Sequence, residues 1–232
     1  MPNTIGENIL RIRGRIARAR EKSSRTDEIT LIAVSKTQPV EAIRAAYEAG
    51  IRHFGENRVQ EWEGKRGLLG DLQASWHLIG HLQSNKAARA AKAFHCVDSV
   101  DDFGVAERLD RAWAELRAPG RLRILIEVRM EDEATKSGAE ISGLSALLEK
   151  IAALKNLEVG GLMCIPPFLE DAERVRPYFA RLREVRDELV GVSGLALAVL
   201  SMGMSHDFEV AIEEGATEVR IGTGIFGSRA VI

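Results

Sequence analysis

One lysine follows directly on a short apolar run, a position that would suit its amine to covalent chemistry. Residues 29–41 read ITLIAVSKTQPVE, in which Lys36 comes just after the β-branched run and ahead of Pro39. Such a run is typical of a strand that is buried on both faces, so Lys36 is expected at the carboxyl end of a strand. A lysine kept from water there can form a Schiff base with an aldehyde. The plainer interpretation is that the strand reaches the surface and the ammonium group is solvated.

Two short glycine-containing segments late in the chain have the composition of a phosphate site. Residues 201–205 read SMGMS, and residues 222–224 read GTG. Small residues let backbone N–H groups approach an anion, and hydroxyl groups add hydrogen-bond donors. Plain turns use the same residues, so composition alone leaves both interpretations open.

Arg220 stands two residues before the GTG segment, in the run EVRIG. Side chains alternate along a strand, so if Val219 and Ile221 pack against helices, Arg220 faces the other side of the sheet. An arginine buried there needs a partner. That partner is either a bound group or an internal carboxylate such as Glu127.

The elements that must position these residues alternate regularly along the chain. Short β-rich runs are separated by longer helical patterns, among them 39–50, 99–117 and 170–191, without a polar linker. A further helix precedes the first strand, with isoleucines 5, 9, 12 and 16 on one stripe. The expected strands are 29–34, 52–55, 76–80, 94–98, 121–130, 157–165, 195–202 and 218–222.

This alternation predicts right-handed βαβ units and a parallel sheet. Eight such units in this length fit a closed (β/α)8 barrel of the TIM type, an α/β fold. Residues 1–232 are then expected to form a single domain with an extra N-terminal helix. An open doubly wound sheet is the alternative, but the first strand is not followed by the GxGxxG turn of a dinucleotide-binding fold.

A closed barrel brings the three candidate features together. Chemistry in such barrels lies in the loops that leave the carboxyl ends of the strands, and phosphate is often bound after strands seven and eight. Lys36, SMGMS and GTG follow strands one, seven and eight, which are neighbours in a closed barrel. A Schiff-base lysine, phosphate-binding turns and an arginine that can meet a ring nitrogen together indicate a site for pyridoxal 5′-phosphate (PLP).

Composition argues against several other classes of protein. The 232 residues carry a net charge of −2, which gives no general attraction to nucleic acid or to a membrane surface. The N-terminus lacks the apolar centre of a signal peptide, so a cytoplasmic location is expected. Cys96 and Cys164 lie in apolar runs and are expected to be reduced core thiols, without a disulfide or a metal centre. The tryptophans, Trp62, Trp76 and Trp113, are expected to be packing residues.

Longer motifs are similar to those of a known family. They are AVSKTQP (33–39), FGENRVQEW (54–62), WHLIGHLQSNK (76–86), KSG (136–138), GLMCIPP (161–167) and LSMGMSHDFEVAIEEGATEVRIGTGIFGSR (200–229). On these motifs the chain resembles the pyridoxal phosphate homeostasis proteins, which are related to the N-terminal barrel of alanine racemase. The likeness extends from the first expected strand to the last.

The resemblance implies a role for individual residues. Lys36 would carry PLP as a Schiff base, Asn57 would lie beside the cofactor, and Arg220 would face the pyridine nitrogen. The residues implied around the phosphate are Ser201, Gly203, Gly222 and Thr223, and those implied as walls of the site are His77 and Met163.

The expected function is to hold and supply PLP within the cell, without a full catalytic apparatus. The chain is expected to act as a monomer, with apo forms of PLP-dependent enzymes as recipients. Racemases similar to this barrel add a second domain whose tyrosine is the opposing base, whereas Tyr47 and Tyr178 here lie in helical patterns. A permanently charged Arg220 also disfavours the protonated pyridine ring that carbanion chemistry needs.

Three other hypotheses stay open. One is a PLP-dependent amino-acid racemase of narrow scope, with His77, His81 or Cys164 as acid–base groups. Another is a Schiff-base aldolase that uses the lysine and the phosphate loops without an aldehyde cofactor. The third concerns Lys136, in EDEATKSG, which would attract the phosphate or hold the aldehyde during transfer, unless it is an ordinary solvated loop lysine.

Overall fold

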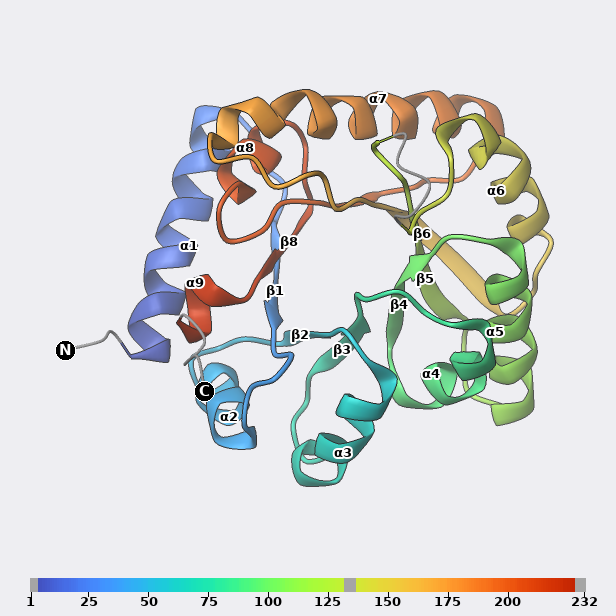
Figure 1. Ribbon diagram of the computed structural model, residues 1–232, viewed down its shortest axis with the longest axis horizontal. Helices are drawn as coiled ribbons and strands as arrows, with labels where there is room; N and C mark the ends of the chain where they lie inside the picture. Colours follow the sequence, from blue (N-terminus) through green and yellow to red (C-terminus); the bar gives the residue numbers. More distant parts are fainter. Residues whose placement is uncertain (1–3, 132–136, 228–232) are drawn as a thin grey trace.

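The computed structural model describes residues 4–131 and 137–227, and within them eight parallel strands close into a barrel in sequence order, as predicted. Each strand is followed by helical segments that surround the barrel (Figure 1). The strands are β1 (Thr30–Val34), β2 (His53–Glu56), β3 (Ser75–Leu78), β4 (Cys96–Val100), β5 (Leu122–Glu127), β6 (Leu157–Met163), β7 (Val199–Ser201) and β8 (Glu218–Ile221).

The surrounding helices include the predicted extra helix at the N-terminus. It is α1, whose N-terminus is held by a capping box between Thr4 and Glu7. Its isoleucine stripe is buried, and it packs against the helix that follows β7. The α-helices are α1 (Ile5–Lys22), α2 (Val40–Glu48), α3 (Val59–Leu69), α4 (Ala87–Ala93), α5 (Phe103–Leu116), α6 (Leu144–Ala152), α7 (Arg176–Ser193), α8 (Phe208–Glu213) and α9 (Thr223–Phe226). Three 3-10 segments are η1 (Ser84–Lys86), η2 (Ile141–Gly143) and η3 (Ala172–Val175).

Two predicted strands have different bounds in the structure. The strand expected at 94–98 is β4, which begins at Cys96 and runs to Val100 through a shift in its pairing with β5, so Asp98 lies in the middle of the strand and not at its end. The strand expected at 195–202 is reduced to β7. Leu197 has φ +39, a left-handed conformation that cannot continue a strand.

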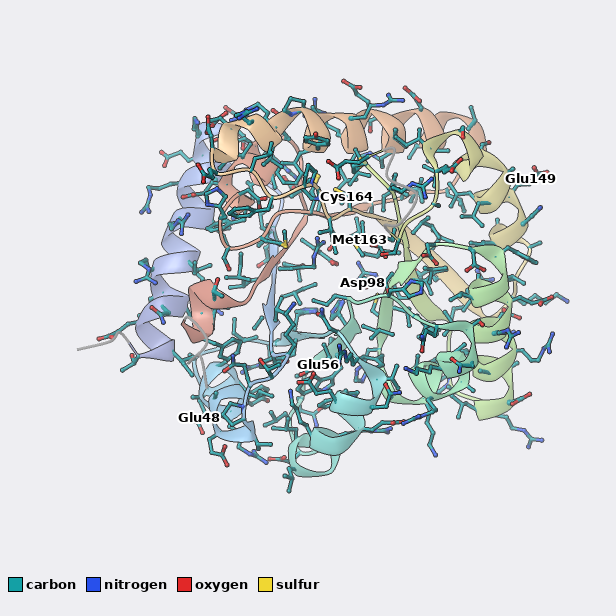
Figure 2. All side chains as sticks on the ribbon, in the orientation of Figure 1. Glu48, Glu56, Asp98, Glu149, Met163 and Cys164 are labelled. Atoms are coloured by element: carbon teal, nitrogen blue, oxygen red, sulfur yellow. The ribbon has the colours of Figure 1, made fainter. Side chains whose placement is uncertain are left out.

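The apolar core lies between the barrel and its helices. Outward-facing strand residues such as Phe54, Leu200 and Val219 are buried in it. The inside of the barrel is more polar. Figure 2 shows Asp98 and Met163 towards the middle of the barrel, whereas Glu48 and Glu149 lie on its outside. Since a buried charge is costly without partners, the interior must be organised by paired groups.

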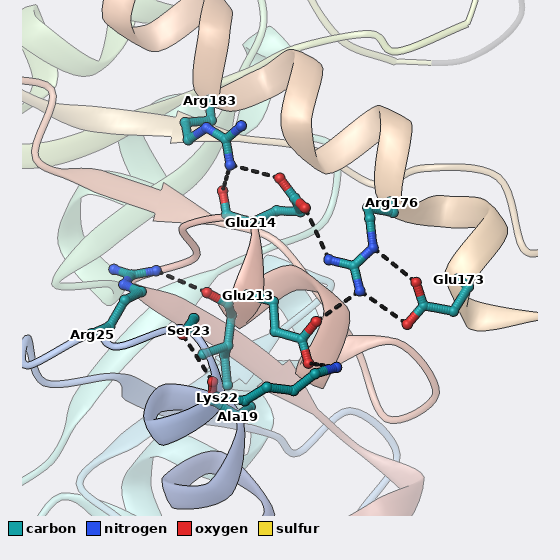
Figure 3. Close-up of polar contacts among 10 residues, drawn as sticks. Ala19, Lys22, Ser23, Arg25, Glu173, Arg176, Arg183, Glu213 and Glu214 are labelled. Carbon is teal, nitrogen blue, oxygen red and sulfur yellow. Dashed lines mark hydrogen bonds and ion pairs between the residues drawn. The ribbon is translucent and has the colours of Figure 1, made fainter.

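A network of ion pairs joins α8 to α1 and α7 (Figure 3). Arg176 bonds to the carboxylates of Glu173, Glu213 and Glu214. Glu213 also pairs with Lys22 at 2.7 Å, and Glu214 pairs with Arg183 at 2.6 Å. The network therefore holds the C-terminal end of α8, the helix that follows the SMGMS segment.

No helix in the described part of the chain combines the length and apolar character needed to cross a membrane.

Candidate cofactor site

Lys36 lies at the predicted place, two residues beyond the last residue of β1, and its side chain is partly buried. The backbone on both sides of it is anchored. The Ser35 carbonyl accepts a hydrogen bond from Lys65 Nζ at 3.0 Å, and the Thr37 N–H donates to Glu61. Thr37 has φ +63, so the chain turns sharply just after the lysine. Lys36 is therefore presented from a fixed backbone at the strand mouth.

The anchor rests on a buried carboxylate, Glu56, at the end of β2. Glu56 is fully buried, accepts a 2.7 Å hydrogen bond from Ser35 Oγ, and lies 3.2 Å from Lys65 Nζ. Burial raises the pKa of the Glu56 carboxyl, although Ser35 and Lys65 both act to lower it. The part played by Lys65 was missed from the sequence, where only its spacing of four from Glu61 pointed to a pair.

The SMGMS segment forms a tight turn around Gly203. Gly203 has φ +91, and a Cβ there would lie 2.6 Å from the Ala211 Cβ and 2.9 Å from the Phe208 Cα. The Gly203 carbonyl accepts a bond from the Arg220 N–H at 3.0 Å, and the Met204 N–H donates to Asp207 at 2.6 Å. Only glycine fits this turn.

The GTG segment lies next to the SMGMS turn and also contacts β1. The Gly224 N–H donates to Ser205 Oγ at 3.2 Å, which joins the two segments. A Cβ on Gly222 would lie 3.5 Å from the Val34 Cβ, so this turn contacts the last residue of β1. Gly222, Thr223 and Gly203 thus border the same mouth from which Lys36 emerges.

Arg220 lies inside the barrel, beneath these turns, and is 3% exposed. Its Nη1 donates to the Ser201 carbonyl at 2.7 Å and to Ser201 Oγ at 2.8 Å, and its Nη2 donates to the Cys164 carbonyl at 2.7 Å. The predicted alternative, an internal salt bridge with Glu127, does not form among the described residues. Glu127 instead accepts a 3.4 Å bond from Ser137 Oγ.

A second cluster of polar side chains, the lower polar group, lies inside the barrel on the side of Arg220 away from the phosphate turns. Its members are His53, His77, Cys96 and Asp98. His77 Nδ1 lies 3.0 Å from Asp98 Oδ2, His77 Nε2 lies 3.1 Å from His53 Nδ1, and the Cys96 thiol donates to Asp98 at 2.7 Å. Burial alone would lower the pKa of His77, but the Asp98 carboxylate outweighs it and the pKa is raised. His77 correspondingly lowers the pKa of Asp98 against the effect of burial. Each group therefore favours the charged form of the other.

Comparison with known proteins agrees with this architecture. The family profile described as "Alanine racemase, N-terminal domain" matches residues 8–230. The pyridoxal phosphate homeostasis protein of Aquifex aeolicus is 47% identical over 225 residues, which is 96% of this chain and 97% of that protein. The chain belongs to the pyridoxal phosphate homeostasis protein family.

Solved structures place this family member among related barrels. PipY of Synechococcus elongatus, solved with PLP bound, superposes with a TM-score of 0.86 at 40% identity, covering 97% of this chain and 100% of that one. Alanine racemase of Clostridium difficile gives a TM-score of 0.72 at 12% identity, covering 94% of this chain and 56% of that one. At so low an identity, this second likeness concerns the fold alone.

The remaining residues that the family resemblance implied lie at different depths. Met163 is the last residue of β6, fully buried and paired with Ser201, so it adjoins Arg220. Asn57 follows β2 at the mouth of the barrel. Its backbone packs closely on Gly80, since a Cβ on Gly80 would lie 2.4 Å from the backbone carbonyl oxygen of Asn57. His77 belongs to the lower polar group described above. Lys136 lies outside the described residues.

The Gly203 turn gives a direct test of the phosphate-loop geometry. Gly203→Ala is expected to lower the free energy of unfolding by about 2 kcal/mol, because the new methyl group adds steric overlap to an unfavourable φ. Urea denaturation measures the change. The matched control is Gly64→Ala on α3, where a Cβ meets nothing within 4 Å and the change should be neutral or stabilising. Equal stability of the two variants would contradict the turn as described.

The lower polar group makes stability depend on pH through His53. Burial and the adjacent His77 lower the pKa of His53 from 6.5 to about 4. Between these values the unfolded chain binds more protons than the folded one, so stability falls as the pH falls from 6.5 towards 4. His53→Asn should remove about 1–2 kcal/mol of that fall, a figure reduced because His53 is partly exposed to solvent.

Urea denaturation at pH 7, 6, 5 and 4.5 measures this difference. His206→Asn, which changes an exposed histidine, serves as the control and should keep the wild-type pH profile. A His53→Asn profile parallel to wild type throughout this range would show that His53 is not held neutral by the fold.

Proposed function

We propose that this protein binds PLP through a Schiff base on Lys36 and takes part in maintaining and supplying the cofactor. The single observation that carries the proposal is the meeting of three features at one end of the barrel. These are the anchored Lys36 after β1, the joined turns after β7 and β8, and Arg220 beneath them. The PLP bound to PipY, a relative with the same fold over nearly its full length, supports the same conclusion.

The residues present fit the cofactor's phosphate and aldehyde. At Gly203 and Gly224 a Cβ would come within 3.0 Å of atoms of the surrounding fold, so glycine lets both turns pack tightly beside the strand ends, and small residues there leave room for an anion to approach the backbone. Thr223 adds a hydroxyl at the same turn. Lys36 supplies the amine, and Asn57 and Met163 would border the ring.

When bound, PLP supplies an aldehyde for covalent attachment and a pyridine ring that can withdraw electrons. Arg220 determines how far the ring can do so. A guanidinium has five N–H donors and no acceptor, so it can hold the lone pair of a ring nitrogen but cannot keep a proton on it. The Ser201 oxygens and the Cys164 carbonyl fix the guanidinium in the barrel. This arrangement favours holding the cofactor over strong carbanion chemistry.

A racemase of narrow scope is the second candidate function, favoured by the match of residues 8–230 to the family profile of the alanine racemase N-terminal domain. The groups named for acid–base work are poorly suited to it. Tyr47 and Tyr178 lie on α2 and α7, outside the barrel. Burial raises the pKa of the Cys164 thiol to about 12, and His77 is engaged by Asp98 and His53. His81 is exposed beside Asp101.

Delivery to apo-enzymes, a monomeric state and a cytoplasmic location are further parts of the proposal. The location is supported by Cys96 and Cys164, which are both buried and free, as expected in a reducing compartment. Light scattering of the purified protein tests the monomer. Mixing the loaded protein with an apo PLP-dependent enzyme, and following recovery of that enzyme's activity, tests delivery.

The deciding experiment is a visible spectrum of the purified protein, with and without added PLP, followed by borohydride reduction and peptide mapping. The proposal requires a yellow protein with its reduced adduct on the Lys36 peptide. A colourless protein that takes up no PLP would favour the aldolase. Exchange of an amino-acid α-proton in deuterated water by the yellow protein would favour the racemase.

A further inference from the structure

A cavity of about 610 Å³ lies on the outside of the barrel, near the start of β3 and β4. Residues of α3, α4 and α5 line it, and these three helices stand side by side around the barrel (Figure 1). Chemistry in this fold belongs to the opposite, carboxyl end of the strands. The cavity is therefore distinct from the candidate cofactor site. Its volume is in the range of about 300–1,000 Å³ that is usual for small-molecule sites.

All three tryptophans of the sequence line this cavity. Trp62 and Trp76 stack with ring centroids 3.7 Å apart, and Phe94 lies against Trp62. Two of the indole N–H groups donate hydrogen bonds to backbone carbonyls. Trp113 donates to the Gly120 carbonyl at 3.1 Å, and Trp62 donates to the Ala93 carbonyl at 2.7 Å. Trp113 is only partly buried, so its ring is available for contact with a ligand.

The polar side chains around the aromatic wall favour an anion. Arg66, Lys92 and His95 line the cavity, and no Asp or Glu is among its lining residues. Neither Arg66 nor Lys92 forms a salt bridge within residues 4–131 and 137–227. Glu63, whose pKa both help to lower, is already paired with Arg89. The Nδ1 atom of His95 accepts a 3.1 Å hydrogen bond from the backbone N–H of Trp76. The ring proton of His95 is therefore on Nε2, where it can be donated to a ligand.

The helix ends at the cavity reduce this positive charge without cancelling it. Arg66 and Lys92 lie in the last turns of α3 and α4, whose terminal carbonyls carry about half a negative charge per helix. Roughly one positive charge is left uncompensated, which suits a ligand with a single anionic group. The carbonyls add acceptors for the hydroxyl or amino groups of such a ligand.

We propose that this cavity binds a nucleoside monophosphate. The base would stack on Trp113, a contact typically worth about 1–3 kcal/mol. Its phosphate would lie between Arg66 and Lys92, since a guanidinium and an ammonium are the usual partners of phosphate. The cavity is independent of Lys36, so this binding neither requires nor competes with a cofactor at the barrel mouth.

Isothermal titration with AMP and with CMP tests the proposal, with and without added PLP. Saturable binding at one site is expected, accompanied by a change in tryptophan fluorescence, because every tryptophan borders the cavity. Adenosine lacks the charge and inorganic phosphate lacks the ring, so each should bind at least about tenfold more weakly than AMP. Failure of both AMP and CMP to bind would overturn the proposal.

Two double variants locate the bound nucleotide. Arg66→Glu with Lys92→Glu should weaken AMP binding by at least tenfold, since a hydrogen bond to a charged group contributes about 1.5–3 kcal/mol. Lys150→Glu with Arg174→Glu makes the same charge change at exposed residues elsewhere and should leave affinity unchanged. If the two variants weakened AMP binding equally, the binding would depend on the net charge of the protein and not on this cavity. Release of PLP by AMP would place the nucleotide at the barrel mouth, and either result would overturn the proposal.

Discussion

Replacing Lys36 with alanine is expected to abolish covalent cofactor binding completely. The variant should lack the visible absorbance of the PLP-loaded protein, and borohydride should produce no pyridoxyl adduct at this end of the barrel. The physical reason is that only an amine can form the Schiff base. The fold should be unaffected, because Ser35 and Thr37 hold the backbone through their own bonds to Lys65 and Glu61.

The phosphate turns make this prediction more specific. They do not depend on Lys36, so the variant should retain weak, noncovalent binding of PLP that calorimetry can detect. Lys86→Ala is the matched control, since Lys86 is another partly buried lysine near Asn57, at the end of η1 after β3. That control should keep the wild-type spectrum. An adduct that persists in Lys36→Ala and disappears in Lys86→Ala would move the reactive lysine to the neighbouring loop.

The sequence was sufficient to predict the barrel because its evidence is local and repeated. Each buried strand is a short apolar run, each helix has its own periodicity, and their alternation admits few topologies. The residues at the mouth of the barrel could be predicted because each comes at or just after the end of an expected strand. Lys36, Gly203 and Gly222 therefore lie where the sequence predicted them, although which of them contact a cofactor stays a prediction.

The interior polar groups could not be predicted in the same way, since they depend on register between distant strands. Asp98 was expected as the last residue of its strand, yet β4 continues to Val100 through a shift in its pairing with β5, and Asp98 lies inside the barrel against His77. Arg220 was correctly expected inside, but its partners are backbone carbonyls of Ser201 and Cys164, which no residue pattern reveals. The three tryptophans pack as expected, and only the folded chain shows that they border one cavity.

Replacing Lys65 with methionine should cause the largest loss of stability among the changes considered. Glu56 is fully buried, and Lys65 is the cation that faces it. Removing one member of such a pair typically costs about 3–5 kcal/mol, because a charge is left buried without compensation. The expected loss is about 3 kcal/mol at pH 8, measured by urea denaturation. Lys22→Met breaks an ion pair whose lysine is 67% exposed and should cost less than about 1 kcal/mol.

The loss should also depend on pH, with a sign that follows from Glu56. Its folded-state pKa is already raised by burial, so its contribution is favourable while it is protonated and is lost as the pH rises through that pKa. Without Lys65 the pKa rises further, and the cost of the substitution should be smaller at pH 5 than at pH 8. Adding Glu56→Gln to Lys65→Met should recover most of the stability at pH 8, because the amide still accepts from Ser35 Oγ and carries no charge. If the double variant were as unstable as Lys65→Met alone, the lysine would act through packing or its bond to the Ser35 carbonyl, and the charge on Glu56 would not be what it compensates.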